Sequence, residues 1–433
     1  MTVLRLLLLA AAVLGALVRP WRLPPFVAPV VCAIVALAAG ATSLQGAGHA
    51  LRPLAAPLAF LAVALPLAAL LDELGYFEQL ASLFGRGPKL YGGLWLLSSL
   101  TVALLNLDVA VVLLTPLYLS IARRVDASPY YLGLQPVVLA LLASSFLPVS
   151  NLTNLIAASH DPGAARPVAF LAHLGLPGLA ACAVGYACYR FSHRRLEEEE
   201  TGLRRGGAGL APGPAPGPGL VPGPARGGAR AAGGASEARD RRTIVLGSTL
   251  VALVVAGFVA GPSFHVAEWE VALGADLVMM VFARRLPLRA VPLQTILLVA
   301  GLGVLAAAAV QDLPLSSLFG GSGILAELRI SAAAAAGANI VNNLPALLVS
   351  LPFVAHRHGS SCGLWPLLAG VNMGPSLVVT GSLASLLWVE SMRRMGVAVD
   401  ALGYLRLGLR VGAPAYAAGL GVLLLISPAF GCG

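Results

Sequence analysis

The stretch L-N-L-D-V-A at residues 105–110 places polar side chains in the middle of an apolar run. Asn106 is followed ten residues later by Pro116, and in the second half of the chain Asn342 is followed ten residues later by Pro352. Helix-breaking residues at matching places in two hydrophobic halves are typical of transporters built from two repeats, whose substrate site lies at the breaks. The two asparagines therefore indicate where a membrane-embedded solute site would form.

A second polar break follows in each half. In the first half it is L-P-V-S-N-L-T-N at residues 147–154. In the second it is N-M-G-P at 372–375, which runs on to T-G-S-L-A-S at 380–385. The two breaks are separated by 45 residues in the first half and by 40 in the second. The matching order of breaks predicts an internal repeat.

The composition fixes the class of protein independently of any motif. Hydrophobic residues make up 58% of the 433 residues and charged residues 11%, and the mean hydropathy is +0.86. A water-soluble chain of this composition would expose more apolar surface than folded proteins tolerate. The apolar runs of roughly 17–25 residues suit membrane-spanning helices and are too long for barrel strands. The net charge of +9 comes mainly from arginines that flank these runs, which indicates membrane topology and not nucleic-acid binding.

These runs predict an all-α integral membrane protein with two inverted-topology repeats, about ten spans and two re-entrant hairpins. Each half holds three spanning helices, a hairpin, a broken helix and a final span. In the first half they are expected at 3–18, 26–44, 53–72, 90–123, 133–158 and 167–189. In the second they are expected at 243–261, 268–283, 291–311, 325–355, 364–390 and 405–426. The predicted domains are the first repeat, 1–190, a linker, 191–242, and the second repeat, 243–433.

If each hairpin returns to the side of the membrane from which it entered, each half crosses the membrane an odd number of times. The second half is then inverted relative to the first. If the linker is cytoplasmic, the basic residues on the outer side are only Arg5, Arg52, Arg166, Arg329 and Arg357, of 28 in the chain. Both termini are therefore predicted to be extracytoplasmic. Arginine outnumbers lysine 27 to one in a chain rich in Ala, Gly and Pro, which suggests a GC-rich bacterial genome and a plasma-membrane location.

The linker contains a run of four glutamates, Glu197 to Glu200, followed by a stretch rich in Gly, Pro and Arg. It has too little apolar content to bury a core. We expect a disordered cytoplasmic tether with solvated charges.

Asparagine and proline at the hairpin tips have a physical reason. Non-helical backbone at membrane depth is tolerated only where it is buried in protein or lines a wet cavity, because an unpaired peptide group in lipid costs several kcal/mol. An asparagine amide caps a broken helix end and still offers donors and acceptors to a solute. Two tips that meet two unwound helices near the midplane would form a cavity lined by helix ends, which suits small polar solutes or ions.

Asp108 is the strongest candidate for coupling. A carboxylate at the bilayer centre costs roughly 2.5–3.5 kcal/mol on insertion scales, and burial favours its protonated form, so it could carry a proton alternately with substrate. The alternative is a carboxyl group that only caps the second hairpin helix. Asp276 is the other acid inside a predicted span and is a second proton-coupling candidate, although it lies outside the repeated motifs.

The sequence predicts no cofactor, no metal site and no catalytic centre. The cysteines are Cys32, Cys182, Cys188, Cys362 and Cys432, and they form no C-x-x-C pair and have no histidine at ligand spacing. We expect all five to pack as small apolar side chains. The absence of an H-E-x-x-H motif or an aspartyl pair argues against an intramembrane enzyme.

Four motifs resemble those of the arsenite efflux permeases of the ion transporter superfamily. They are L-N-L-D-V-A-V-V-L-L-T-P, L-P-V-S-N-L-T-N-L-I, A-N-I-V-N-N-L-P-A and V-N-M-G-P-S-L-V-V-T-G-S-L-A-S-L-L-W, which begin at residues 105, 147, 338 and 371. The resemblance covers nearly the whole chain apart from the linker. It implies export of arsenite and antimonite driven by the proton gradient, with an elevator-like movement of the hairpin domain.

The resemblance also implies which residues bind the solute. They are Asn106, Asp108, Ser150, Asn151, Thr153, Asn154, Asn342, Asn343, Asn372, Gly381 and Ser382. Such permeases work alone or with a soluble arsenite-stimulated ATPase. The sequence leaves open whether that subunit docks and whether the chain forms a homodimer.

Two other functions of the same fold stay open, sodium/proton antiport and sodium-coupled transport of an organic anion. Carboxylate-transporting relatives carry S-N-T at both hairpin tips, whereas the tips here read N-L-D and N-N-L. Losing the hydroxyls weakens a sodium site, and an ionised Asp108 would repel a dicarboxylate in a medium of low dielectric constant. Uncharged arsenite suits amides, hydroxyls and one protonatable acid, so we expect proton-coupled arsenite export.

Overall fold

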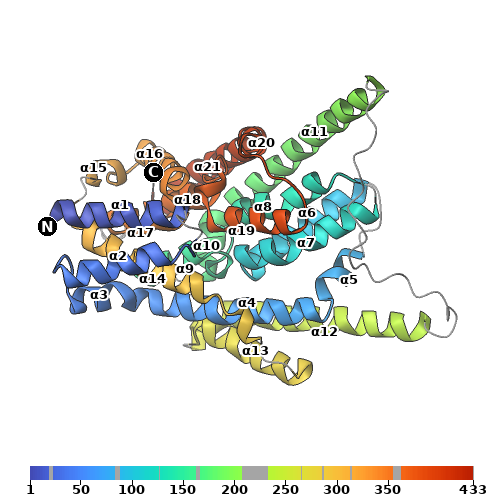
Figure 1. Cartoon of the computed structure of the whole chain (residues 1–433), viewed down its shortest axis with the longest axis horizontal. Helices are drawn as coiled ribbons and strands as arrows, with labels where there is room; N and C mark the ends of the chain where they lie inside the picture. The colour runs from blue at the N-terminus through green and yellow to red at the C-terminus, as the bar shows by residue number, and fades with distance from the viewer. Residues whose placement is uncertain are drawn as a thin grey trace.

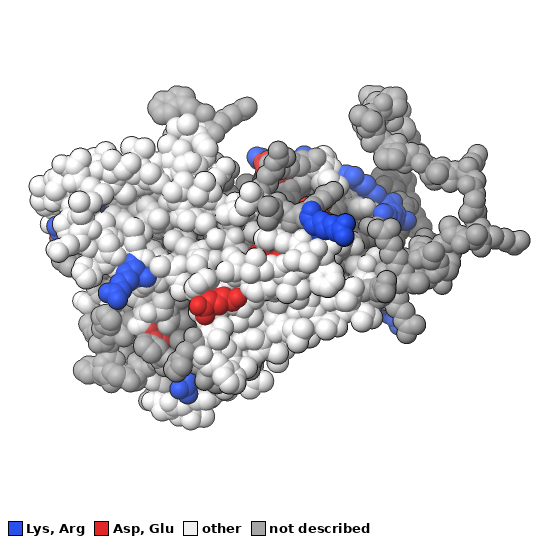
Figure 2. Space-filling view, turned by 90° about the horizontal axis from the view of Figure 1, so that it is seen from below, with Lys and Arg blue, Asp and Glu red and all other residues white. Residues whose placement is uncertain are grey.

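The computed structural model describes residues 1–18, 23–82, 88–125, 127–161, 166–206, 233–264, 266–284, 287–312, 315–354 and 362–432. Every regular element in these ranges is a helix, as the hydrophobic runs predict. Four of the described segments are long and apolar enough to cross a membrane, and eight shorter apolar helices accompany them. The face shown in Figure 2 carries few charged side chains. Elsewhere in the described chain large apolar residues such as Ile34 and Phe282 are exposed, as expected for contact with lipid.

The first half follows the predicted order of elements. Its helices are α1 (Thr2–Val18), α2 (Val27–Ala38), α3 (Leu44–Leu51), α4 (Ala55–Glu73), α5 (Tyr76–Ser82), α6 (Pro88–Leu104), α7 (Leu107–Arg124), α8 (Pro129–Leu142), α9 (Leu152–His160), α10 (Pro167–Phe170) and α11 (Leu176–Gly206). The helices α6 and α7 form the hairpin, and α8 and α9 are the two parts of the broken helix. The second span is shorter than predicted, because the chain turns at Gly40, whose φ is +69°.

The second half has the same order. Its helices are α12 (Gly233–Ala260), α13 (Glu268–Ala283), α14 (Leu293–Ala309), α15 (Ser316–Phe319), α16 (Ile324–Val341), α17 (Asn343–Val354), α18 (Leu364–Met373), α19 (Leu383–Arg394), α20 (Ala401–Leu407) and α21 (Ala413–Ile426). Here α16 and α17 form the hairpin and α18 and α19 the broken helix. Both hairpins thus turn at the asparagines that the sequence singles out.

The two halves also share their irregularities. A proline lies inside the second helix of each hairpin, Pro116 in α7 and Pro352 in α17. A 3₁₀ turn lies in each broken helix, and a π-helical turn interrupts each final span, at Leu171–Gly175 and at Gly408–Gly412. Such interruptions have local causes in the sequence. The internal repeat itself stays a prediction. The inverted relation of the two halves stays a prediction.

The helices form two groups that pack mainly within themselves (Figure 1). The core group is α6–α11 with α15–α21, and the flanking group is α1–α5 with α12–α14. In the core group α7 packs against α8 and α19, α16 against α18, and α11 along α21. The flanking group meets the core group chiefly where α14 contacts α17 and where α4 contacts α7 and α9. Both hairpins and both broken helices therefore belong to one group.

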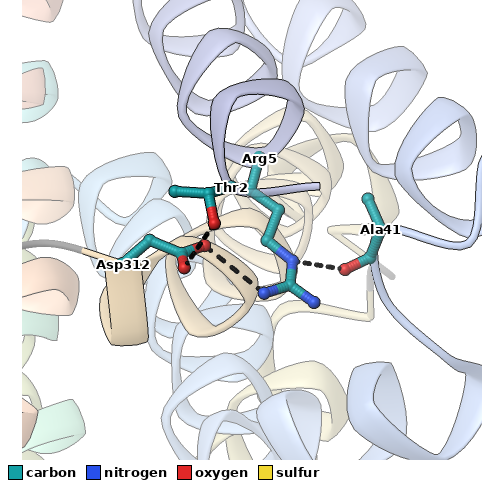
Figure 3. A network of polar contacts seen from close by, with 4 residues as sticks. All are labelled: Thr2, Arg5, Ala41 and Asp312. Carbon is teal, nitrogen blue, oxygen red and sulfur yellow. Dashed lines mark hydrogen bonds and ion pairs between the residues drawn. The ribbon is translucent and has the colours of Figure 1, made fainter.

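A polar network joins flanking helices from the two halves (Figure 3). Arg5 on α1 donates from Nε to the carbonyl of Ala41 at 2.8 Å and pairs with Asp312, just beyond α14, at 3.3 Å. Thr2 donates to the other carboxylate oxygen of Asp312 at 2.9 Å. Charge-assisted bonds of this kind are stronger than neutral ones, so the network holds the start of α1 against the end of α14.

The helices next to the linker lie far from the chain termini. In Figure 1 the end of α11 and the start of α12 point to the right, whereas both termini lie towards the left. The helix α11 continues to Gly206 and α12 starts at Gly233, so both reach into the predicted linker. Residues 207–232, the middle half of the predicted tether, lie outside the described residues.

Candidate solute-binding site

The tip of the first hairpin is held by Asn106. Its Oδ1 accepts a hydrogen bond from the backbone N–H of Asp108 at 2.8 Å, which caps the start of α7. Its Nδ2 donates to the carbonyl of Val149 at 3.4 Å. Val149 is the middle residue of the 3₁₀ turn between α8 and α9. One buried side chain therefore caps the hairpin helix and joins it to the broken helix.

Asn342 has the same two contacts in the second hairpin. Its Oδ1 accepts from the N–H of Leu344 at 3.3 Å, and its Nδ2 donates to the carbonyl of Thr380 at 3.0 Å. Thr380 is the middle residue of the 3₁₀ turn between α18 and α19, the place that Val149 takes in the first half. Asn342 differs from Asn106 in its backbone, because its φ is +81° with ψ at 152°, a region that is almost restricted to glycine.

The two halves meet through the side chain of Asn372, in the last turn of α18. Its Oδ1 accepts from Asn151 Nδ2 at 2.9 Å and from Thr153 Oγ1 at 2.7 Å. Its Nδ2 donates to Asn154 Oδ1 at 2.7 Å. All four side chains are at most 3% exposed. The sequence predicted each of them as a site residue, and the structure brings them into one hydrogen-bonded group, named here the amide cluster.

The unwound segment before α9 is held by Ser150 and Asn154. Ser150 Oγ lies 2.6 Å from the carbonyl oxygens of both Ser144 and Leu147. Asn154 Nδ2 donates to the same two carbonyls at 2.7 and 2.9 Å. A break in a helix leaves carbonyls without partners, and these two side chains satisfy them.

The corresponding segment before α19 uses hydroxyl groups. Ser382 Oγ accepts from the N–H of Ser385 at 3.0 Å, and Ser385 Oγ lies 3.0 Å from the hydroxyl of Tyr404. Gly381 packs so closely that a Cβ there would lie 2.9 Å from the carbonyl oxygen of Pro375. Ser382 and Gly381 therefore shape the second break, and no hydrogen bond joins them to the amide cluster among the described contacts.

Asn339 is a site residue that the sequence reasoning missed. Its Oδ1 accepts from the N–H groups of Leu377 and Val378 at 3.3 and 3.2 Å, and its Nδ2 donates to the carbonyl of Gly374 at 2.8 Å. It therefore holds the unwound segment after α18 in place. Its spacing could have revealed it, because Asn339 lies three residues before Asn342 and so near the same face of α16.

Close packing of α16 against α18 fixes the position of Asn372. Gly370 on α18 and Gly374, the residue just after α18, lie on either side of it, four residues apart, and small residues face them on α16. A Cβ on Gly370 would overlap the carbonyl oxygen of Ser331, and a Cβ on Gly374 would overlap Ala335. Small residues at this spacing let two helices approach closely in a membrane.

The remaining predicted residues lie around or away from the amide cluster. Asp108 is 5% exposed in the first turn of α7, and its Oδ1 has no hydrogen-bond partner among the described residues. Asn343 is also buried, at the start of α17. Asp276 is 1% exposed on α13, which packs against α4 and α12 in the flanking group. The structure therefore does not bring Asp276 to the cluster.

The prediction that all five cysteines are unpaired is wrong for two of them. Cys362 and Cys432 form a disulfide, which links the start of α18 to the end of the chain. Cys32, Cys182 and Cys188 are free, as expected. The pairing was missed because the two cysteines are 70 residues apart, and only the return of α21 to α18 brings them together.

The arrangement offers uncharged donors and acceptors at helix ends. The helices α7 and α9 begin at capping asparagines and α19 begins at a capping serine. Such ends carry partial positive charge from their N–H groups, and the capping amides can exchange one hydrogen-bond partner for another. Within the described residues no group of three or more His, Cys, Asp and Glu side chains could hold a metal ion.

Comparison with known proteins gives a family. The family model described as "Citrate transporter" (CitMHS) matches residues 5–373. An uncharacterized transporter of Mycobacterium bovis and one of Mycobacterium tuberculosis are each 29% identical to the chain over 192 residues, which is 40% of this chain. The chain spans 45% of the length of each relative. These relatives are named as transporters and not as enzymes. Because the family model covers most of the chain, the chain belongs to the CitMHS family of membrane transporters.

Proposed function

We propose that this transporter exports arsenite and antimonite from the bacterial cytoplasm in exchange for protons. The observation that carries the proposal is the chemistry of the amide cluster, in which three amides and one hydroxyl meet with no charged side chain. An uncharged trihydroxide has both O–H donors and oxygen acceptors, so it can replace these hydrogen bonds without leaving a buried polar group unpaired. A charged solute would need a compensating charge.

Asp108 supplies the coupling in this proposal. It lies two residues beyond the tip that Asn106 holds, and one of its carboxyl oxygens is free to gain a partner. A protonated Asp108 is uncharged and can cross with the hairpin, whereas an ionised one is costly to bury. Asp276 is the second coupling candidate, in the flanking group.

The division into two groups supports an elevator-like movement. All of the proposed solute-binding residues lie in the core group, and that group contacts the flanking group over limited areas. A small crevice lined by apolar residues separates the tip residue Asn342 from α1 and α14. Apolar contacts of this kind lack directional bonds, so the core group can slide past the flanking group in the proposed cycle.

A second candidate function is transport of a carboxylate such as citrate, which the description of the family model favours. In that case the N-terminal ends of α7 and α9 would compensate the negative charge of the anion. Asp108 would have to be protonated whenever the anion is bound, and a cation such as sodium would enter with it.

Everted membrane vesicles test the two candidates directly. Wild-type protein is expected to take up arsenite and antimonite when a pH gradient is imposed, and Asp108→Asn is expected to lose this gradient-driven uptake. Ser350→Ala is the matched control, because Ser350 is buried but bonds only to Ala346 of its own helix. Uptake of citrate without uptake of arsenite would establish the second candidate. If neither solute moves while sodium drives proton movement, both candidates fail and sodium/proton antiport replaces them.

A further inference from the structure

A cavity of about 430 Å³ lies at the start of the second hairpin, away from the amide cluster. It is partly open, and its walls include Phe319, Ile330 and Phe353, with the disulfide of Cys362 and Cys432 at one side. Its volume falls within the roughly 300–1,000 Å³ that is usual for small-molecule sites. Neither the family match nor the proposed transport cycle assigns a role to it.

Glu327 is the ionisable side chain in this cavity that lacks a full set of partners. It is 3% exposed, and its Oε1 accepts a hydrogen bond from Ser427 Oγ at 2.6 Å. Its Oε2 is buried without a hydrogen-bond partner among the described residues. A buried carboxylate oxygen without a partner is costly, so an additional donor would stabilise it.

The basic side chain closest to Glu327 in the sequence of α16 does not neutralise it. Arg329 donates from Nε to the carbonyl of Leu318 at 3.2 Å and from Nη2 to the carbonyl of Gly320. These bonds fix the loop before α16, and the ion pair found among the described residues joins Arg5 to Asp312 instead. Within the part of the chain that the structure describes, no basic side chain pairs with Glu327, so its carboxyl group can take a partner from a ligand.

We propose that this cavity binds a small organic cation, an ammonium or guanidinium group on an apolar body, with Glu327 as its counter-ion. The head group would donate to Oε2, and the apolar body would lie against Phe319, Ile330 and Phe353. A divalent metal ion fits less well, because such ions require several oxygen ligands and one carboxylate is present here. The disulfide holds the end of the chain against the start of α18 and so maintains one wall of the cavity.

The cavity is separate from the proposed solute-binding site. Glu327 lies in the first turn of α16, and the tip residue Asn342 is the C-cap of the same helix, 15 residues later. At a rise of 1.5 Å per residue this is about 22 Å. A ligand beside Glu327 therefore cannot touch the hairpin tip, and binding there can be measured whether or not arsenite is the transported solute.

The test is isothermal titration of the full-length protein in lipid nanodiscs with butylammonium and butylguanidinium, and with 1-pentanol as a neutral probe. Both cations are expected to bind and the alcohol is not. Glu327→Gln is expected to weaken cation binding about tenfold or more, because a charge-assisted hydrogen bond is lost. Glu270→Gln is the matched control, since Glu270 is on α13 and bonds to the exposed N–H of Ala267.

A second variant keeps the test valid if Glu327→Gln does not fold. Ser322→Phe places a large side chain at the rim and leaves the bond between Glu327 and Ser427 intact, so it is expected to reduce cation binding by a comparable factor. Reduction of the disulfide is expected to weaken binding in the wild type. Absence of cation binding, equal binding of the alcohol, or unchanged affinity in both variants would overturn the proposal.

Discussion

Asn151 and Asn372 lie 221 residues apart in the sequence, yet Asn151 Nδ2 donates a hydrogen bond to Asn372 Oδ1 at 2.9 Å. The bond joins the start of α9 in the first half to the last turn of α18 in the second. Asn372 is also bonded to Thr153 and Asn154, so one side chain holds the two broken helices together. Its removal would affect both the fold and the proposed solute site.

Asn372→Ala is expected to lower the thermal unfolding midpoint in detergent and to abolish solute uptake. The substitution removes the partner of Thr153 Oγ1 and Asn154 Oδ1 and leaves Asn151 Nδ2 only a 3.5 Å contact with Ser144, and each unsatisfied buried group costs about 1–3 kcal/mol. Ser350→Ala removes a buried hydroxyl that bonds only within α17, and it should change the midpoint much less. Equal midpoints for the two variants would show that the amide cluster does not hold the broken helices together.

The two tip asparagines should respond differently to glycine. At Asn342 the positive φ strains any residue except glycine, by about 1–3 kcal/mol, so Asn342→Ala should be less stable than Asn342→Gly. At Asn106 the backbone is extended, with φ at 176°, and glycine should give no advantage over alanine. Thermal unfolding of the four variants measures this. The prediction is contradicted if the glycine variant is more stable than the alanine variant at both tips, or at neither.

The glycines around Asn372 should not tolerate a methyl group. Gly370→Ala places a Cβ against the carbonyl oxygen of Ser331 and should separate α16 from α18, with a loss of folded protein in size-exclusion profiles. Gly421→Ala is the matched control, because no atom lies within 4 Å of its Cβ position in α21. Alanine in place of glycine in an open helical position should be neutral or stabilise by about 0.5–1 kcal/mol.

The two acids should differ in their effect on coupling. Asp276→Asn should retain pH-gradient-driven uptake, because α13 belongs to the flanking group and packs against α4. Asp108→Asn should lose it, since this acid lies beside the hairpin tip. The two variants are compared by measuring uptake with and without an imposed pH gradient, in vesicles that contain matched amounts of protein. If only Asp276→Asn loses coupling, the proton-carrying residue is Asp276 in the flanking group and not Asp108.

The disulfide provides a test of topology. Disulfides form in oxidising compartments such as the bacterial periplasm, so Cys362 and Cys432 should lie on the outer side. In a variant with Cys32, Cys182 and Cys188 replaced by serine, intact cells treated with a membrane-impermeant phosphine should become reactive to an impermeant maleimide. Labelling that occurs only in everted vesicles would reverse the predicted orientation, in which both termini are extracytoplasmic.

Much of the fold could be predicted because it depends on local sequence. The asparagines at 106 and 342 mark the hairpin tips. Pro148 and Pro375 lie in the gaps between α8 and α9 and between α18 and α19, where a proline disfavours a continuous helix. The cysteine pair and Glu327 could not be predicted in the same way. Cys362 meets Cys432 only when α21 returns to α18, and Glu327 begins a helix that reads as an ordinary apolar run. The partners of Asn372 likewise depend on long-range packing.

The amide cluster occurs once in a molecule whose elements occur twice. Aligning the two 3₁₀ turns places Leu141 where Asn372 would have its counterpart, and places Ala384 opposite Thr153. The first half supplies Asn151, Thr153 and Asn154, and the second half supplies Asn372, which accepts two of the hydrogen bonds and donates the third. The two halves are therefore not interchangeable, and a hybrid with two first halves would lack the cluster altogether.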